Sequence, residues 1–190
     1  TNTNVQTMAI SPFFSTDSTI FLGTLGGGIF RSTDGANSWQ SASTGLSVMD
    51  IFHIAISPDY MTDKTLYGVG WGGVLLRSTN GGDLWHTFSS ALSKKAVRTV
   101  IVSPNFAEDR TIFVGTIGSG VLRSQDGGTT WVRSSQGLEQ PTILTLVISP
   151  NFRIDSTLFA GTASGVFQST NNGRSWKQIN LGLSNLIIAS

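Results

Sequence analysis

The sequence predicts an all-β protein, a β-propeller built of four four-stranded blades. A pattern of the form Ser-x-Asp/Asn-x-Gly/Ala-x-x-Trp occurs four times, beginning at Ser32, Ser78, Ser124 and Ser169. Ser-Pro pairs recur every 46 residues, at positions 11, 57, 103 and 149. A repeat of about 40 to 50 residues that contains several short strands is typical of a propeller blade, which buries its faces only against neighbouring blades.

The strands follow in the same order within each repeat. A short apolar segment ends at each Ser-Pro pair, as in Ile51–Ser57, and suits a strand that is buried on both faces. Two further segments follow, Thr19–Thr24 and Gly28–Ser32 in the first repeat, and a last strand opens at each motif Trp. Gly, Asn and Asp separate these segments and mark the turns.

The motif itself predicts a locked hairpin turn. Asp or Asn accepts hydrogen bonds from nearby backbone N–H groups, Gly supplies a positive φ, and Trp fills the apolar edge where two strands diverge. Recurrence at equivalent places favours this structural role over metal binding or acid catalysis. The residues concerned are Asp34, Trp39, Asn80, Trp85, Asp126, Trp131, Asn171 and Trp176.

A second repeated carboxylate stands two residues before a strand in every repeat, as Asp17, Asp63, Asp109 and Asp155. We interpret this column as a repeated turn cap. Calcium binding is the alternative, but each loop offers one carboxylate where calcium takes six or more oxygen ligands. No metal site and no cofactor is predicted.

Composition narrows the classes of partner. Twelve Lys and Arg against eleven Asp and Glu give a formal charge of +1, without the basic stripe that would follow a nucleic-acid backbone. The apolar runs are too short for a membrane span, and cysteine is absent. Low charge with abundant Gly, Ser, Thr and Asn favours an extracytoplasmic or secreted protein.

The four motifs resemble the Asp-box, also called the bacterial neuraminidase repeat. Together with the Ser-Pro-x-Phe/Tyr-x-x-Asp-x-Thr-Ile/Leu segment, they make the chain similar to the sortilin-like, photosystem II stability/assembly factor-like and xyloglucanase-like propellers. This resemblance implies the fold. It leaves open sialidases, glucanases, lectin-like binders, sorting receptors and assembly factors.

Such propellers usually have six to ten blades, and the sequence holds four complete repeats. We interpret residues 1–190 as one domain with blades at about 5–50, 51–96, 97–142 and 143–190. A closed ring of four blades is the favoured arrangement, and part of a larger propeller is the alternative.

Residues that break the repeat are the candidates for a specific site. Trp71 stands where the other repeats carry Leu25, Ile117 and Ala163, and it lies among glycines on a loop, where an aromatic ring suits stacking. The blade-linking segments are expected on the same face. They supply Lys94, Lys95 and Arg98 as a positive cluster, and Asp50 and Glu139 as acids. The alternative for Trp71 is that it packs between adjacent blades, and the alternative for the charged residues is that they are solvent-exposed on the rim without a specific role.

The chain has two histidines. His53 replaces the threonine of the innermost strands, and a hydrogen-bonded role is favoured over titration or metal binding. His86 follows a motif Trp and is expected on the surface.

A binding role is favoured over catalysis. The only tyrosines, Tyr60 and Tyr67, belong to repeated aromatic columns, and Arg31, Arg77 and Arg123 form another, so no sialidase-type site stands out. Asp50 and Glu139 are the only off-repeat carboxylates that suit a glucanase-like pair. The predicted function is a non-catalytic module that binds a glycan or a protein; a self-assembling surface or filament subunit, with possible homo-oligomers, and a polysaccharide hydrolase are the alternatives.

Overall fold

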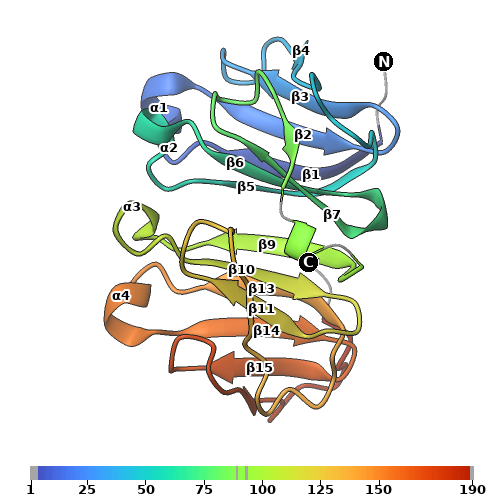
Figure 1. Ribbon diagram of the computed structural model, residues 1–190, viewed down its shortest axis with the longest axis vertical. Coiled ribbons are helices and arrows are strands. Elements are labelled where there is room, and N and C mark those ends of the chain that lie inside the picture. Colours follow the sequence, from blue (N-terminus) through green and yellow to red (C-terminus); the bar gives the residue numbers. More distant parts are fainter. Residues whose placement is uncertain (1–3, 89, 93, 189–190) are drawn as a thin grey trace. The chain divides into compact units, whose positions relative to one another are not determined.

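The computed structural model describes residues 4–88, 90–92 and 94–188. The chain divides into two compact units, Thr1–Phe88 (unit 1) and Ser89–Ser190 (unit 2). Each unit holds two four-stranded antiparallel sheets, which we call blades 1 and 2 in unit 1 and blades 3 and 4 in unit 2 (Figure 1). The all-β class and the four blades are thus as the sequence predicts, whereas closure into a ring and the single-domain interpretation stay predictions.

The strands of unit 1 follow the predicted segments. Blade 1 consists of β1 (Val5–Ile10), β2 (Ile20–Thr24), β3 (Gly28–Ser32) and β4 (Gln40–Ser41). Blade 2 consists of β5 (Ile51–Ile56), β6 (Leu66–Gly70), β7 (Val74–Ser78) and β8 (His86–Thr87).

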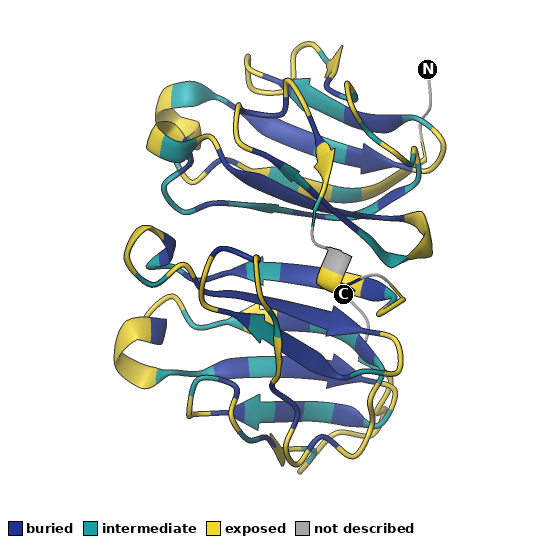
Figure 2. Ribbon diagram, in the orientation of Figure 1, coloured by how far each residue is buried: buried dark blue, intermediate teal, exposed yellow. Residues whose placement is uncertain are grey.

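Unit 2 repeats this order. Blade 3 consists of β9 (Val97–Val102), β10 (Ile112–Thr116), β11 (Val121–Ser124) and β12 (Val132–Arg133). Blade 4 consists of β13 (Ile143–Ile148), β14 (Leu158–Thr162), β15 (Gly165–Ser169) and β16 (Lys177–Gln178). The last strand of every blade is only two residues long, and its residues are exposed, whereas the two middle strands are largely buried (Figure 2).

One helical turn follows each Ser-Pro pair, where the sequence predicted a plain turn. These turns are α1 (Phe14–Asp17), α2 (Tyr60–Asp63), α3 (Phe106–Asp109) and α4 (Phe152–Asp155). The Asp that ends each turn holds it in place. In the first turn, one oxygen of Asp17 accepts from the Ser11 hydroxyl at 2.6 Å and the other from the Thr19 backbone N–H at 2.9 Å. The other three blades make the same pair of bonds.

Blades of one unit pack closely along a seam. In unit 1 the rings of Phe21 and Tyr60 meet edge to face with centroids 6.1 Å apart, and in unit 2 Phe113 and Phe152 do so at 5.9 Å. Gly23 lies on the unit 1 seam, where a Cβ would stand 2.7 Å from Ile51 Cγ2. The glycine is therefore required by the close approach of the two sheets.

An arginine and a tryptophan cross each seam in opposite directions. The Arg31 guanidinium donates to Gly81 O at 2.8 Å and pairs with Asp83 at 2.7 Å, and Arg123 donates to Asn172 O at 3.0 Å. In return, the indole N–H of Trp85 donates to Ala42 O at 2.9 Å, and that of Trp176 to Ser134 O at 2.8 Å. Both tryptophans are buried. The motif thus holds neighbouring blades together as well as its own turn.

Candidate binding surface

Three loops of unit 1 are tied together around Asp50. Its carboxylate accepts from the Gly26 N–H at 2.6 Å, and its backbone carbonyl accepts from the Trp71 N–H at 2.9 Å. The neighbouring Met49 carbonyl accepts from the Gly28 N–H at 2.8 Å. The loops after β2, before β5 and after β6 therefore form one hydrogen-bonded end of the unit.

Trp71 stands out from this end. It opens the 3-10 turn η1 (Trp71–Gly73), in which Gly72 and Gly73 take φ of 73° and 74° and so reverse the chain within three residues. The side chain is 64% exposed. Its ring lies 6.2 Å from that of Phe52, at an interplanar angle of 49°. An exposed indole on such a turn presents apolar area with little side-chain freedom to lose on binding.

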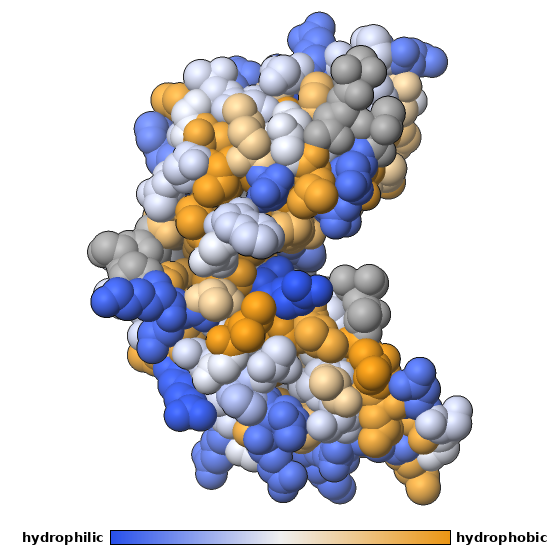
Figure 3. Space-filling model, turned by 90° about the vertical axis from the view of Figure 1, so that its right-hand side faces the viewer, coloured by the Kyte–Doolittle hydropathy of each residue, from blue (hydrophilic) through white to orange (hydrophobic). Residues whose placement is uncertain are grey.

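Further apolar side chains reach the surface at the same end. Leu25 and Met49 are exposed, and Phe52 is half-buried. We call Leu25, Met49, Phe52 and Trp71 the loop-end cluster. Figure 3, which views the molecule from its right-hand side in Figure 1, shows hydrophobic residues at the surface of the upper unit, which is unit 1. Exposed apolar residues gathered in this way mark interaction sites more often than single exposed ones do.

The departures from the repeat that predicted a site include Trp71 and Asp50, whereas Phe52 and Met49 were not predicted. A signal was present: Phe52 replaces Gln6, Arg98 and Leu144 of the other repeats. Asp50 itself is half-buried, and its carboxylate is engaged by Gly26, so it serves to hold the loops.

The other predicted site residues belong to unit 2. Lys94, Lys95, Arg98 and Glu139 are all exposed there, and Lys94 takes a φ of 69°. The structure brings Asp50 and Trp71 together in unit 1. A single face shared with the lysines, and a catalytic pair of Asp50 with Glu139, stay predictions.

The motif carboxylates are occupied by their own loops. Asp34 accepts from the Ser38 hydroxyl and backbone N–H at 2.5 and 2.9 Å, and from the Ser32 hydroxyl at 2.7 Å. These bonds lower the pKa of Asp34 to about 2, and the two bonds from Ser38 contribute most. Bonds from Thr130 likewise hold the pKa of Asp126 well below its usual range. Permanently charged acids of this kind are unsuited to exchange protons near neutral pH.

The remaining candidates offer little chemistry. Burial lowers the pKa of His53, which favours the neutral imidazole, and His86 is exposed. Tyr60 and Tyr67 are buried, and burial raises the pKa of Tyr60 to about 12. Within residues 4–88, 90–92 and 94–188, no three His, Asp or Glu side chains gather to hold a metal ion. Helices in that same part of the chain are too short to cross a membrane.

Comparison with known proteins gives matches only among solved structures. No protein-family model matches the chain, and no curated protein matches it either. An ancestral GH74 enzyme superposes with a TM-score of 0.73 and 22% identity, over 93% of this chain and 24% of the enzyme. The GH74 xyloglucanase of Xanthomonas campestris gives 0.69 and 18%, over 96% of this chain and 31% of the enzyme.

The protein YCF48, in a structure bound to D1 peptide, gives a TM-score of 0.66 and 16% identity, over 93% of this chain and 55% of that protein. The chain therefore spans about a quarter to just over half of the length of these similar proteins. The structures confirm a chain of propeller blades, and they confirm the Asp-box resemblance at the level of the fold. Since both hydrolases and a peptide-bound protein share this fold, the fold does not decide the activity.

Proposed function

We propose that this chain is a non-catalytic binding module whose loop-end cluster holds a partner molecule. The exposure of Trp71 on a hydrogen-bonded base carries the proposal. A preorganised aromatic side chain loses little freedom on binding, and such residues supply a large share of the affinity at protein interfaces.

The composition of the cluster favours a protein segment with apolar side chains over a sugar. Leu25 and Met49 add exposed apolar groups on loops that are hydrogen-bonded to the loop of Trp71 or adjoin its partner Asp50. Asp50, which would pair with sugar hydroxyls, is engaged by the Gly26 N–H. An apolar surface with few open polar groups suits burial of apolar side chains, whereas a sugar needs hydrogen-bond partners for its hydroxyls.

The arrangement gives little support to a hydrolase. The buried tyrosines lack access to a substrate, and Arg31 and Arg123 are used at the seams. A glycosidase of the common type also needs one carboxylic acid with a raised pKa. Hydrogen bonds within their own loops lower the pKa of the motif acids Asp34 and Asp126 instead.

The test is the variant Trp71→Ala. Peptides selected from a display library on the wild-type protein should bind the variant about 5- to 150-fold more weakly, the loss expected for an aromatic anchor. The melting temperature should stay unchanged because the side chain is exposed. The control Ile154→Ala removes another exposed apolar side chain, 86% accessible and in unit 2, and should leave peptide binding unchanged.

Other outcomes would replace the proposal. Binding on a glycan array that depends on Trp71 would change the partner class. Hydrolysis of xyloglucan that is abolished by Asp50→Asn and Glu139→Gln would establish the enzyme. Light scattering that shows large assemblies, unaffected by Trp71→Ala, would favour the self-assembling subunit.

A further inference from the structure

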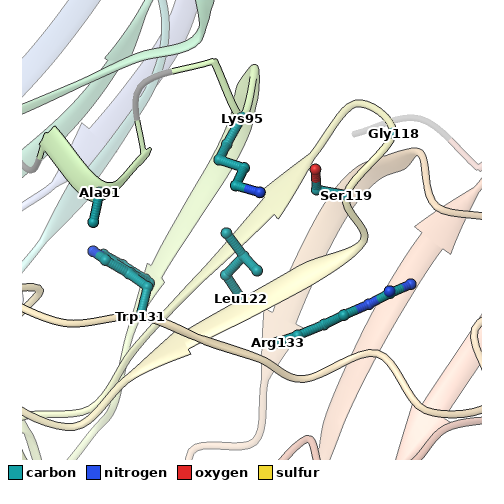
Figure 4. Close-up of a pocket in the computed structure, with 7 residues that line it drawn as sticks. All are labelled: Ala91, Lys95, Gly118, Ser119, Leu122, Trp131 and Arg133. Atoms are coloured by element: carbon teal, nitrogen blue, oxygen red, sulfur yellow. The ribbon is translucent and has the colours of Figure 1, made fainter.

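Unit 2 carries a pocket of about 300 Å³ on blade 3. Ala91 lines it from the 3-10 turn η2 (Ser90–Leu92), and Lys95 from the segment before β9. Gly118 and Ser119 come from the turn between β10 and β11. Leu122 on β11, Trp131 at the end of the motif loop and Arg133 on β12 complete the lining (Figure 4).

Both cations of this pocket break the repeat. Arg133 pairs in register with Leu122 across β11 and β12, at a place that Ser41, Thr87 and Gln178 occupy in the other blades. Lys95 stands where the other linkers have Met49 and Pro141. A scaffold role shared by all blades would not require charge at these two places in one blade alone.

Among the described residues, neither of the two charges forms an ion pair with an acid. The ion pairs of the described residues are Arg31 with Asp83 and Arg153 with Glu108, so neither Lys95 nor Arg133 takes part in one. Asp109, Asp126 and Asp155 of the same unit bond to hydroxyl and backbone groups of their own loops, and the exposed Glu139 forms no ion pair with either cation. Two cations beside apolar walls therefore attract an anion.

The rest of the lining is apolar with one hydroxyl. The Trp131 ring is half-buried, and its N–H donates to Gly128 O at 2.9 Å. In Figure 4 the side chains of Lys95 and Leu122 extend toward each other from opposite sides of the pocket, beside the Trp131 ring. Ser119 adds a hydroxyl on the rim. A ligand that fits combines a carboxylate with a compact body that has both apolar and hydroxyl-bearing parts.

The backbone around the pocket decides between a sugar and a peptide. The N–H groups of Gly118 and Gly120 both donate to Pro141 O, at 3.2 and 2.7 Å, and that of Ser119 donates to Thr116 Oγ1 at 3.1 Å. The turn that faces the pocket thus has no N–H left to pair with a peptide backbone. A sugar does not pair with backbone N–H groups in this way, and the pocket offers its hydroxyls the side chains of Ser119, Lys95 and Arg133 as partners.

We propose that this pocket binds a short run of hexuronate units of an acidic polysaccharide, with Lys95 and Arg133, which extend into different parts of the pocket, each on a carboxylate and with Trp131 against a ring (Figure 4). An arginine and a lysine suit a carboxylate because charge-assisted hydrogen bonds are about twice as strong as neutral ones. The site is separate from the loop-end cluster of unit 1 and does not depend on its function.

The experiment titrates the whole chain with trigalacturonate and with its methyl ester, followed by calorimetry. The ester keeps nearly the same size and all hydroxyls but removes the charge. It should therefore bind more weakly than the acid, by a factor of about ten or more. Lys95→Gln and Arg133→Gln should each cost a similar factor for the acid and little for the ester. Added salt should weaken binding of the acid alone.

The matched control is Lys177→Gln, which removes an exposed strand lysine of the same unit. It should leave the affinity for both the acid and the ester unchanged. Equal affinity for acid and ester, full binding by Arg133→Gln, or no binding of trigalacturonate at about 10 mM would each overturn the proposal. Tighter binding of a peptide with a free terminal carboxylate than of trigalacturonate would overturn it as well. Both charge variants lie at the surface, so circular dichroism should show an unchanged fold.

Discussion

The four motif tryptophans have the same sequence context but two different environments. Trp85 and Trp176 are 1% and 6% exposed, whereas Trp39 and Trp131 are half-buried. The buried member of each pair belongs to the second blade of its unit and donates its N–H to the first blade. Trp131 donates instead within its own loop, to Gly128 O. The comparison teaches that burial of this residue is a property of the seam and not of the motif alone.

The largest expected effect tests this difference directly. Trp85→Ala should lower the free energy of unfolding by about 3–5 kcal/mol, since it empties a filled seam and leaves Ala42 O without its donor. Trp39→Ala should cost about 1–2 kcal/mol, because that ring is already partly in water. Urea unfolding measures both. Equal losses at the two positions would show that the motif tryptophan stabilises mainly its own blade.

A smaller effect concerns the glycine that lies opposite the buried tryptophan. Gly45 has a φ of 80°, and a Cβ there would collide with Trp85 O, so Gly45→Ala should destabilise by about 1–3 kcal/mol. Gly137 has the same relation to Trp176 O in unit 2.

The second repeat supplies the control, because Ala91 occupies the equivalent position and lies in the turn η2 without a positive φ. Ala91→Gly should change the free energy of unfolding by no more than about 1 kcal/mol. If Gly45→Ala cost as little free energy of unfolding in the same urea experiment, the close approach to Trp85 O would not be what requires glycine at position 45.

The smallest effect distinguishes the charged motifs from the neutral ones. The folded pKa of Asp34, about 2, lies below its ordinary value, so its bonds stabilise the fold above pH 4 and lose that effect as the pH falls toward 2. Asp34→Asn should remove this dependence, since Asn80 fills the same place in blade 2.

Urea midpoints measured between about pH 5 and 2 should therefore converge for wild type and Asp34→Asn. The reverse change, Asn80→Asp, should introduce a new loss of stability over the same range. A constant difference between wild type and variant across these pH values would contradict the assignment.

Local order was predictable because each repeat encodes it in neighbouring residues. Strand periodicity, Ser-Pro pairs and motif turns act within a few positions, so the strand segments around Ile51 and Gly28 follow from the chain alone. The repeated Asp indicated a capped turn but not its helical conformation, which depends on Asp17 reaching back across six residues to Ser11. Repeat-breaking also identified Trp71 and Lys95 as exposed candidates.

The sequence by itself therefore determined the blade, its strand order and the residues that depart from the repeat. Only the tertiary structure decided which of them meet. Phe52 lies beside Trp71, Asp50 ties the loops together, and Arg133 shares a pocket with Lys95 and Trp131. The physical reason is that turns and strands arise from interactions between near neighbours in the chain, whereas these contacts arise when separate segments pack and bury their surfaces.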